Sequence, residues 1–263
     1  MKSTMEITLS FHKMLRPLLA PSFRHQKTIS HTLGRRTSIK DAIESFDIPH
    51  TEIGSILVNK NAVDFSYLLC PGDSIQVSPL AVPVDPCRKS FLRPNHLPHL
   101  RFLVDVNVAK LRTHLRMIGM DTLYEPNLVD SELAGLAMQK QCIVLSRDRG
   151  LLRRKIIEHG HLIRSQNPTE QLAEVLHYYG LQNKINPFSR CIHCNDLLQS
   201  VAKEEIMNDL EPLTKKHYEE FSRCSACNKI YWSGSHRKGM EQTLKQALQM
   251  HLEWMGAYSS LKE

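Results

Sequence analysis

The sequence predicts a multi-domain protein that combines a small β-rich domain with a parallel α/β domain and a metal-stabilised module. Three observations lead to this. Strand patterns around one helical stripe fill the first part of the chain, strand and helix patterns alternate from about residue 100, and two cysteine pairs follow. With 263 residues, the chain has room for two or three domains of ordinary size, which is about 100–150 residues each.

The first predicted domain covers residues 1–82. Alternating patterns predict strands at MEITLSF and TISHTL, and again at SILVNKNAV and SIQVSPL. Between them, SIKDAIESF predicts a short helix with Ser38 as its N-cap and Asp41 three residues on. The resulting ββαββ order is that of a ubiquitin-like β-grasp.

The stretch ILVNKNAVDFSYLLCPGDSIQVSPL resembles the sulfur-carrier proteins of the ThiS and MoaD type. Those proteins act through a free C-terminal Gly-Gly, whereas this chain continues into AVPVDPCRKS. The difference favours a docking or stabilising module over a carrier, and a protein partner for this domain is a further expectation.

A linker rich in Pro and His is expected at 83–99, followed by an α/β domain at 100–185. Strands are predicted at RFLVD, DTLY, CIVLS and HLIR, and helices at VAKLRTHLRMI, SELAGLAMQK, GLLRRKIIEH and PTEQLAEVLHYYG. The last helix carries Asn167 as N-cap, Pro168 at its first position and Gly180 at its end. Four strand–helix units predict a parallel sheet with helices on both faces.

Three carboxylates follow strands of this predicted sheet. Asp105 ends the first strand, Asp130 follows the second and opens a helix, and Asp148 follows the third. Functional groups of open parallel sheets gather at the C-terminal strand ends, so we expect the three to converge. Oxygen ligands favour Mg²⁺ or Mn²⁺, which support phosphodiester hydrolysis. Alternatively, each Asp is an ordinary helix cap.

Basic residues surround these acids. Arg112 and Arg116 share one helix face, Arg147 and Arg149 flank Asp148, and Arg153 and Arg154 follow. They are candidate RNA-phosphate contacts, which give affinity without sequence choice, and a solvated face or simple ion pairs are the alternative. Net charge is +7, with the largest excess between residues 91 and 190.

The segment RFLVDVNVAKLRTHLRMIGMDTLYEPNLVDSELAGLA, followed by VLSRDRGLL, resembles the PIN-like RNase domain of the Mut-seven-C family. This resemblance implies a metal-dependent RNA endonuclease with Asp105, Asp130 and Asp148 as catalytic residues. Glu132 is a reserve for the second acid because Ser131 stands where the family often has an acidic residue. Asn107 is a further candidate, for a hydrogen bond to metal-bound water, with a turn role as the alternative.

The cysteine pairs predict a structural zinc site in a module at 186–240. Cys191 and Cys194, then Cys224 and Cys227, form two CxxC motifs, and four thiolates complete tetrahedral Zn²⁺. Asn195 and Asn228 follow the pairs, where positive φ is often needed. The segment CSACNKIYWSGSHRKGM also resembles the zinc ribbon of the same family. A closing amphipathic helix is expected within 241–263, with Leu244, Leu248, His251, Leu252 and Met255 near one face.

No apolar run approaches the roughly 18 residues that cross a bilayer, and no signal peptide is recognisable, so a cytoplasmic protein is expected. No nucleotide cofactor is expected. Two other functions compete with the nuclease. One is a non-catalytic RNA-binding or scaffold protein. The other is an aspartate-nucleophile phosphatase, which would need a second Asp where Asn107 stands.

Overall fold

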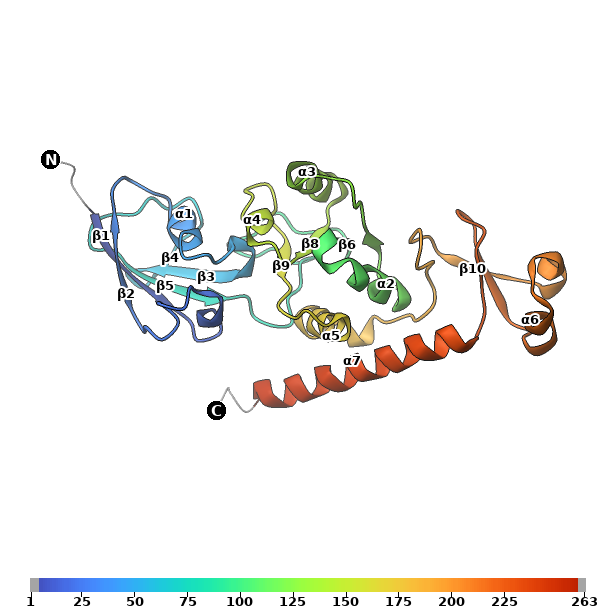
Figure 1. Ribbon diagram of the computed structural model, residues 1–263. Coiled ribbons are helices and arrows are strands. Elements are labelled where there is room, and N and C mark those ends of the chain that lie inside the picture. The colour runs from blue at the N-terminus through green and yellow to red at the C-terminus, as the bar shows by residue number, and fades with distance from the viewer. Residues whose placement is uncertain (1–4, 260–263) are drawn as a thin grey trace. The chain divides into compact units, whose positions relative to one another are not determined.

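The computed structural model describes residues 5–259 (Figure 1). Residues 1–4 and 260–263, which belong to the first and last predicted segments, lie outside the described residues. The chain forms two compact units, each discontinuous in sequence. The first runs to His99 and resumes at Asn127–Leu162, and the second contains Leu100–Pro126 and the residues from Ile163 onward. Each unit is described by itself.

The first unit begins with the ubiquitin-like domain. Its strands are β1 (Met5–Phe11), β2 (Ile29–Leu33), β3 (Ile53–Val58), β4 (Asn61–Ala62) and β5 (Ser74–Pro79), and its helices are α1 (Ile39–Glu44) and the short 3-10 turns η1 (Arg16–Leu18) and η2 (His50–Glu52). The sheet order is β2-β1-β5-β3-β4, with β1 and β5 parallel and the other pairs antiparallel. The predicted strand–strand–helix–strand–strand order is confirmed, with the short β4 added.

The core of this domain comes from one face of each element. Ile7, Leu9 and Phe11 alternate inward along β1, and Ile39 and Ile43 of α1 are fully buried. Helix α1 starts where expected, because the Ser38 hydroxyl accepts a hydrogen bond from the Asp41 amide at 3.1 Å.

The remainder of the first unit contains α3 (Asp130–Lys140), β8 (Ile143–Ser146), α4 (Arg149–Leu152) and β9 (Gly160–Leu162). Strands β8 and β9 pair in parallel. The helix predicted over 150–159 is wrong in length, because α4 ends at Leu152. Beyond it the carbonyls of Ile157 and Glu158 accept hydrogen bonds from His50 and Arg93 rather than from a further helical turn.

The second unit begins with β6 (Phe102–Val104), η3 (Val106–Val108), α2 (Ala109–Met117) and β7 (Thr122–Leu123), and continues with α5 (Pro168–Tyr179) and η4 (Leu181–Asn183). Strands β6 and β7 are also parallel. The predicted caps of α5 are confirmed. Asn167 accepts from the amides of Thr169 and Glu170, and Gly180 ends the helix with φ of 60°.

A small antiparallel sheet follows in the order β10-β11-β12, formed by β10 (Leu198–Val201), β11 (Phe221–Cys224) and β12 (Ile230–Tyr231). The connection between β10 and β11 holds η5 (Lys203–Asp209) and α6 (Pro212–His217). Ile206, Leu210 and Phe221 make its small core. With so few buried apolar side chains, this region needs stabilisation from another source.

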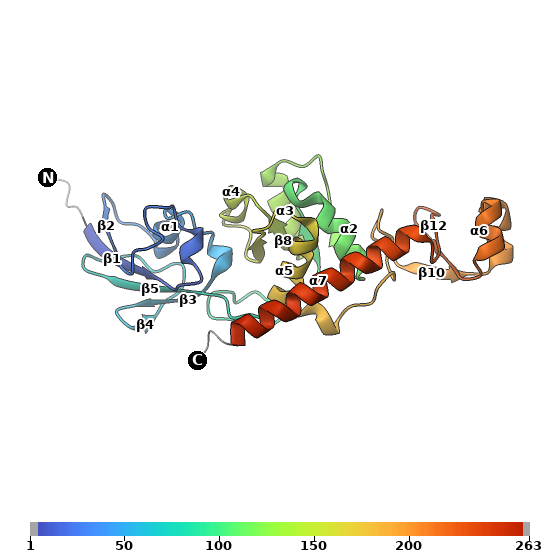
Figure 2. The same cartoon turned by 60° about the horizontal axis from the view of Figure 1, so that its bottom comes forward.

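Helix α7 (Ser235–Ser259) packs along α5 in both views (Figure 1 and Figure 2). Its buried stripe is Leu244, Ala247 and His251, spaced by three and four residues. Leu252 and Met255 were expected on that face, but they are 60% and 45% exposed. Across the described residues, no helix combines the length and apolarity needed to span a membrane.

Candidate active site and metal centre

Asp105 lies in the second unit, directly after β6. It is the N-cap of η3, and its Oδ1 accepts from the Val106 amide at 2.6 Å. Its Oδ2 accepts from the Asn107 amide nitrogen Nδ2, also at 2.6 Å. The side chain is buried, with 7% of its residue surface exposed, whereas Asn107 is exposed. Asn107 therefore fixes the orientation of the first predicted carboxylate.

Asp148 lies in the first unit, two residues after β8. Its Oδ1 accepts from the amides of Gly150 at 2.6 Å and Leu151 at 3.4 Å, so Asp148 is the N-cap of α4. Its own amide donates to the Ser146 hydroxyl at 2.8 Å. The residue is exposed, and Oδ2 accepts no hydrogen bond from the described part of the chain. Capping thus uses Oδ1 alone of the two oxygens of this carboxylate.

Asp130 is the first residue of α3 in the same unit. Its Oδ2 lies 3.6 Å from Nη2 of Arg154, and its side chain remains 49% exposed. Glu132, the reserve acid, is used by the helix itself, because its Oε2 accepts from the Val129 amide at 3.1 Å. Asp130 is therefore the more available of the two acids. The convergence of Asp105 with Asp130 and Asp148 stays a prediction.

The predicted RNA-binding arginines fall into two groups. Arg116 is 4% exposed, and its guanidinium donates to the carbonyls of Thr122, Ile192 and His193. Arg149 and Arg153 both bond to the carboxylate of Asp47. These three guanidiniums are held by protein partners.

The second group differs in exposure. Arg112 is partly buried and stacks over the Tyr124 ring, 4.2 Å from its centroid. Arg147, next to Asp148, is partly buried. Arg154 is exposed, with 41% of its side-chain surface accessible, so it is the most accessible of the six predicted arginines.

The four cysteines form a cluster in the second unit that could hold a metal ion. Sγ atoms of Cys191, Cys194, Cys224 and Cys227 all lie within 4.8 Å of one another. A tetrahedral Zn²⁺ that binds four sulfurs at about 2.3 Å also keeps the sulfurs within this separation of one another, so the cluster fits such an ion. Asn195 and Asn228 have φ of 72° and 57°, which confirms the positive φ expected after each pair.

Thiol ionisation in this cluster is uneven. Burial raises the pKa of Cys191, but hydrogen bonds from the Tyr231 hydroxyl and from the amides of Cys194 and His193 outweigh it and lower the pKa to about 6. Burial and the neighbouring thiols raise the pKa of Cys194 to about 12. A first thiolate therefore disfavours a second one in the absence of a cation, and a divalent metal removes that penalty.

The turn that carries Cys191 and Cys194 is tied to the rest of its unit by hydrogen bonds. The Asn195 side chain donates to Asp121 Oδ1 at 2.7 Å and accepts from the Thr122 amide at 3.0 Å. Arg190 donates to the carbonyls of Gly119 and Asn195. These hydrogen bonds connect the cysteine turn to the residues between α2 and β7.

Comparison with known families agrees with these features. The family model of the Mut7-C RNAse domain matches residues 100–244, and that of the Mut7-C ubiquitin matches residues 4–85. The chain belongs to the Mut7-C RNAse domain family. The Mut7-C match contains the three predicted carboxylates and all four cysteines, and the family suggests a nuclease. No curated protein and no solved structure matches the chain.

Several residues that support the Mut7-C segment were missed in the sequence. Asp47, Glu52 and Arg93 lie outside the RNase match and contact residues 149–162, which belong to it. They come from a helix end, a short turn and a linker, where no periodic pattern distinguishes a buried ion from a solvated one. Arg93 offered one signal, an isolated cation beside apolar residues in SFLRPN.

Proposed function

We propose that the protein is a metal-dependent ribonuclease that hydrolyses RNA phosphodiester bonds. The observation that carries the proposal is the position of the acids within the Mut7-C match. Asp105 and Asp148 each follow a buried strand of a parallel pair, at the strand end where α/β proteins place their functional groups. Asp130 opens a helix between them in sequence.

The donor set suits Mg²⁺ or Mn²⁺, because hard cations prefer carboxylate oxygens. Asp148 retains Oδ2 for a ligand, and Asp130 is half exposed beside Arg154. When bound, such an ion supplies activated water and neutralises charge on the phosphate. Asp105, Asp130 and Asp148 would hold it.

The chain's own residues supply orientation and charge. Asn107 holds the Asp105 carboxylate through Oδ2. An amide cannot exchange a proton as a carboxylic acid does, so this arrangement does not favour aspartate-nucleophile phosphatase chemistry. Arg112, Arg147 and Arg154 would contact RNA phosphates, whereas Arg116 acts within the fold.

A structural Zn²⁺ held by the four cysteines belongs to the same proposal. The three-stranded sheet with two CxxC turns suggests a zinc ribbon. Four thiolates leave no open coordination position, so this ion would stabilise the fold rather than act on RNA. The Tyr231 hydroxyl, 3.0 Å from Cys191 Sγ, would donate a hydrogen bond to the bound thiolate.

The test compares cleavage of a mixed RNA pool by the wild type and by Asp148→Asn in Mg²⁺ or Mn²⁺. Asn is a good N-cap, so the variant keeps α4 capped while it removes the charge. Asp209→Asn, at an exposed residue of η5, is the matched control. We expect cleavage by the wild type and the control only, at equal zinc content. Equal cleavage by Asp148→Asn would remove the enzyme proposal.

A non-catalytic RNA-binding role is the second candidate. The observation that favours it is that Asp105 and Asp148 are both helix caps, a role that requires no chemistry. RNA retention by the wild type without any cleavage, across both metals, would support this alternative.

A further inference from the structure

The end of α1 in the ubiquitin-like domain contacts α4, whose N-cap is Asp148. Asp47 lies just after α1, and its Oδ2 accepts from Arg149 Nη1 at 2.5 Å. The same guanidinium nitrogen donates to the carbonyls of Leu18 and Asp47. Arg149 is the first residue of α4 and follows Asp148 directly. Leu18 and Asp47 of the N-terminal domain thus hold the helix start, and Asp47 alone contributes a charge.

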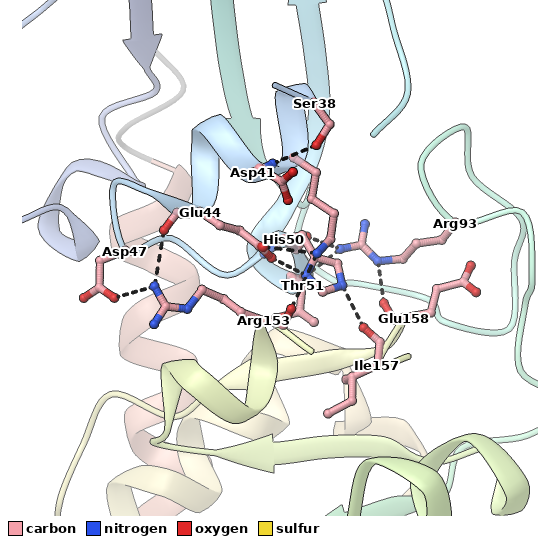
Figure 3. A network of polar contacts seen from close by, with 11 residues as sticks. Ser38, Asp41, Glu44, Asp47, His50, Thr51, Arg93, Arg153, Ile157 and Glu158 are labelled. Atoms are coloured by element: carbon pink, nitrogen blue, oxygen red, sulfur yellow. Dashed lines mark hydrogen bonds and ion pairs between the residues drawn. The ribbon is translucent and has the colours of Figure 1, made fainter. Parts of the chain in front are cut away.

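Arg153, at the other end of α4, is held by the same carboxylate. Its Nη1 lies 3.1 Å from Asp47 Oδ1 and 3.3 Å from the Glu44 carbonyl, as Figure 3 shows. The ammonium of Lys40 approaches the Arg153 carbonyl at 3.5 Å. The two oxygens of Asp47 therefore bind both ends of a helix of four residues.

The backbone conformation at Asp47 is unusual. Its φ of 67° lies in the left-handed region, which costs energy for residues other than Gly and is best tolerated by Asn and Asp. Asp47 lies in the turn that follows α1, and its carboxylate contacts both arginines. A residue placed in this way gives its carboxylate a fixed direction.

Buried polar contacts near Asp47 stabilise the interface between the N-terminal domain and residues 149–162. Arg93 is 6% exposed and donates to the carbonyls of His50, Thr51, Ile53 and Glu158. Glu52 is 2% exposed, and its Oε1 accepts from the Leu162 amide at 2.8 Å and lies 3.1 Å from His161 Nδ1. The ubiquitin-like domain thereby satisfies backbone groups of the β8–β9 segment.

Close packing adds a steric constraint at the same interface. A Cβ at Gly160 would lie 3.3 Å from Thr51 Cγ2 and 2.8 Å from Leu152 Cδ2, so the glycine permits η2 to approach β9. His50 Nε2 donates to the Ile157 carbonyl at 2.8 Å (Figure 3). The N-terminal domain therefore contacts the segment after Asp148 at α4, at Ile157 and at β9.

From these contacts we infer that Asp47 is a positioning residue of the RNase site. It holds Arg149 and Arg153, and through them it fixes α4 and the Asp148 carboxylate at its start. This inference rests on the proposed function, because Asp148 is a metal ligand and a catalytic residue only under that proposal. It gives the ubiquitin-like domain a role within its own chain, as a support for the third acidic segment.

An alternative role for Arg149 and Arg153 is direct phosphate binding, with Asp47 as a competitor for RNA. The two roles predict different kinetics. A lost phosphate contact raises KM and weakens the salt dependence of RNA binding. A lost positioning contact lowers kcat while KM stays unchanged.

The experiment measures kcat and KM of Asp47→Asn, with Asp41→Asn as the matched control. Asn retains the left-handed backbone and the size of Asp47 and removes only the charge. Asp41 lies six residues earlier, on α1, and is exposed and outside this interface. We expect kcat to fall by about ten-fold, as is typical when a residue that orients a ligand is lost, with KM and its salt dependence unchanged. Tighter RNA binding or an unchanged kcat in Asp47→Asn would overturn the inference.

Two further measurements separate this inference from the proposed function. Arg153→Gln should lower kcat as well, and the double variant with Asp47→Asn should cost no more than the more severe single one. Amide hydrogen exchange of residues 149–153 should accelerate in Asp47→Asn while that of β1 and β5 stays the same. Unchanged exchange would overturn the positioning role even if the enzyme is active. If no variant or wild type cleaves RNA, accelerated exchange would show that Asp47 orders α4 although the nuclease proposal has failed.

Discussion

Arg116 shows how a cation that looks functional in sequence can serve the fold. Its spacing with Arg112 predicted a shared surface, but one turn of helix separates a residue stacked on Tyr124 from one that is 4% exposed. Three carbonyls accept from Arg116, one in β7 and two in the turn between Cys191 and Cys194. The two arginines have different roles because Arg116 is buried and Arg112 is only partly buried. No local pattern in the sequence predicts which of them is buried.

Replacing Arg116 by Gln should therefore lower stability more than RNA affinity. The carbonyl of the buried Thr122 and those of Ile192 and His193 lose a charged donor. Since a buried group left unpaired costs about 1–3 kcal/mol, we expect a loss of about 2 kcal/mol in the free energy of unfolding. Urea denaturation in the presence of zinc measures it. Arg154→Gln is the control, with little effect on stability. A stable Arg116→Gln protein with weakened RNA binding would contradict this assignment.

Glu44 links the interface near α4 to pH. Burial raises its pKa, but the hydrogen bond and charge of His50, together with Lys40, outweigh burial and hold the pKa below its ordinary value of 4.5. A carboxylate with a lowered folded-state pKa stabilises the protein above its unfolded-state pKa, and this contribution is lost as pH falls through the lowered value.

Glu44→Gln should consequently be less stable than the wild type at neutral pH, and the difference should shrink as pH falls below 4.5. Thermal melts across this pH range provide the measurement. Parallel curves for the two proteins, with a constant difference in Tm, would show that the charge of Glu44 has no linked effect.

At the scale of elements, the success of prediction followed the locality of the signal. The caps of α5 at Asn167 and Gly180 were predicted because both depend on residues within one helical turn. The length of α4 was predicted wrongly because its end depends on His50 and Arg93, which are distant in sequence. The buried face of α7 was shifted for the same reason, since α5 selects Ala247 rather than Leu252.

The folding of the region of β10–β12, which carries the four cysteines, should depend on a bound metal. Its apolar core is small, and its cysteines repel one another's negative charge without a cation. We expect Cys224→Ser to abolish stoichiometric zinc and to unfold the region of β10–β12, while the ubiquitin-like sheet persists. Zinc content by mass spectrometry and hydrogen exchange of the two sheets test this. Cys87→Ser, outside the cluster, is the control.

At the scale of the whole molecule, the sequence predicted the types of domain but not how they share the chain. A linker at 83–99 suggested that the ubiquitin-like domain is separate from the α/β domain. In the structure, the ubiquitin-like domain and residues 127–162 form one compact unit. Pairings such as Glu52 with the Leu162 amide cross 110 residues of sequence, and a single sequence contains no signal for them.

Residues 100–263 expressed alone should therefore be less stable than the full chain. Removal of residues 1–99 leaves the Leu162 amide and the Ile157 carbonyl without their buried partners. We expect rapid proteolysis near residues 147–162, and protection when residues 1–99 are added in trans. Equal protease resistance of the fragment and the full chain would contradict the shared unit.

The left-handed conformation of Asp47 and its two arginines also bear on how this architecture is inherited and made. During synthesis, the N-terminal domain emerges before residues 149–162, so the carboxylates of Asp47 and Glu52 gain their partners at Arg149, Arg153 and Leu162 only later. Its final stability is thus reached only after part of the RNase match has been translated. A gene rearrangement that separated the two family matches would separate Asp47 from Arg149 and Arg153. We therefore expect the two domains to stay in one chain during evolution.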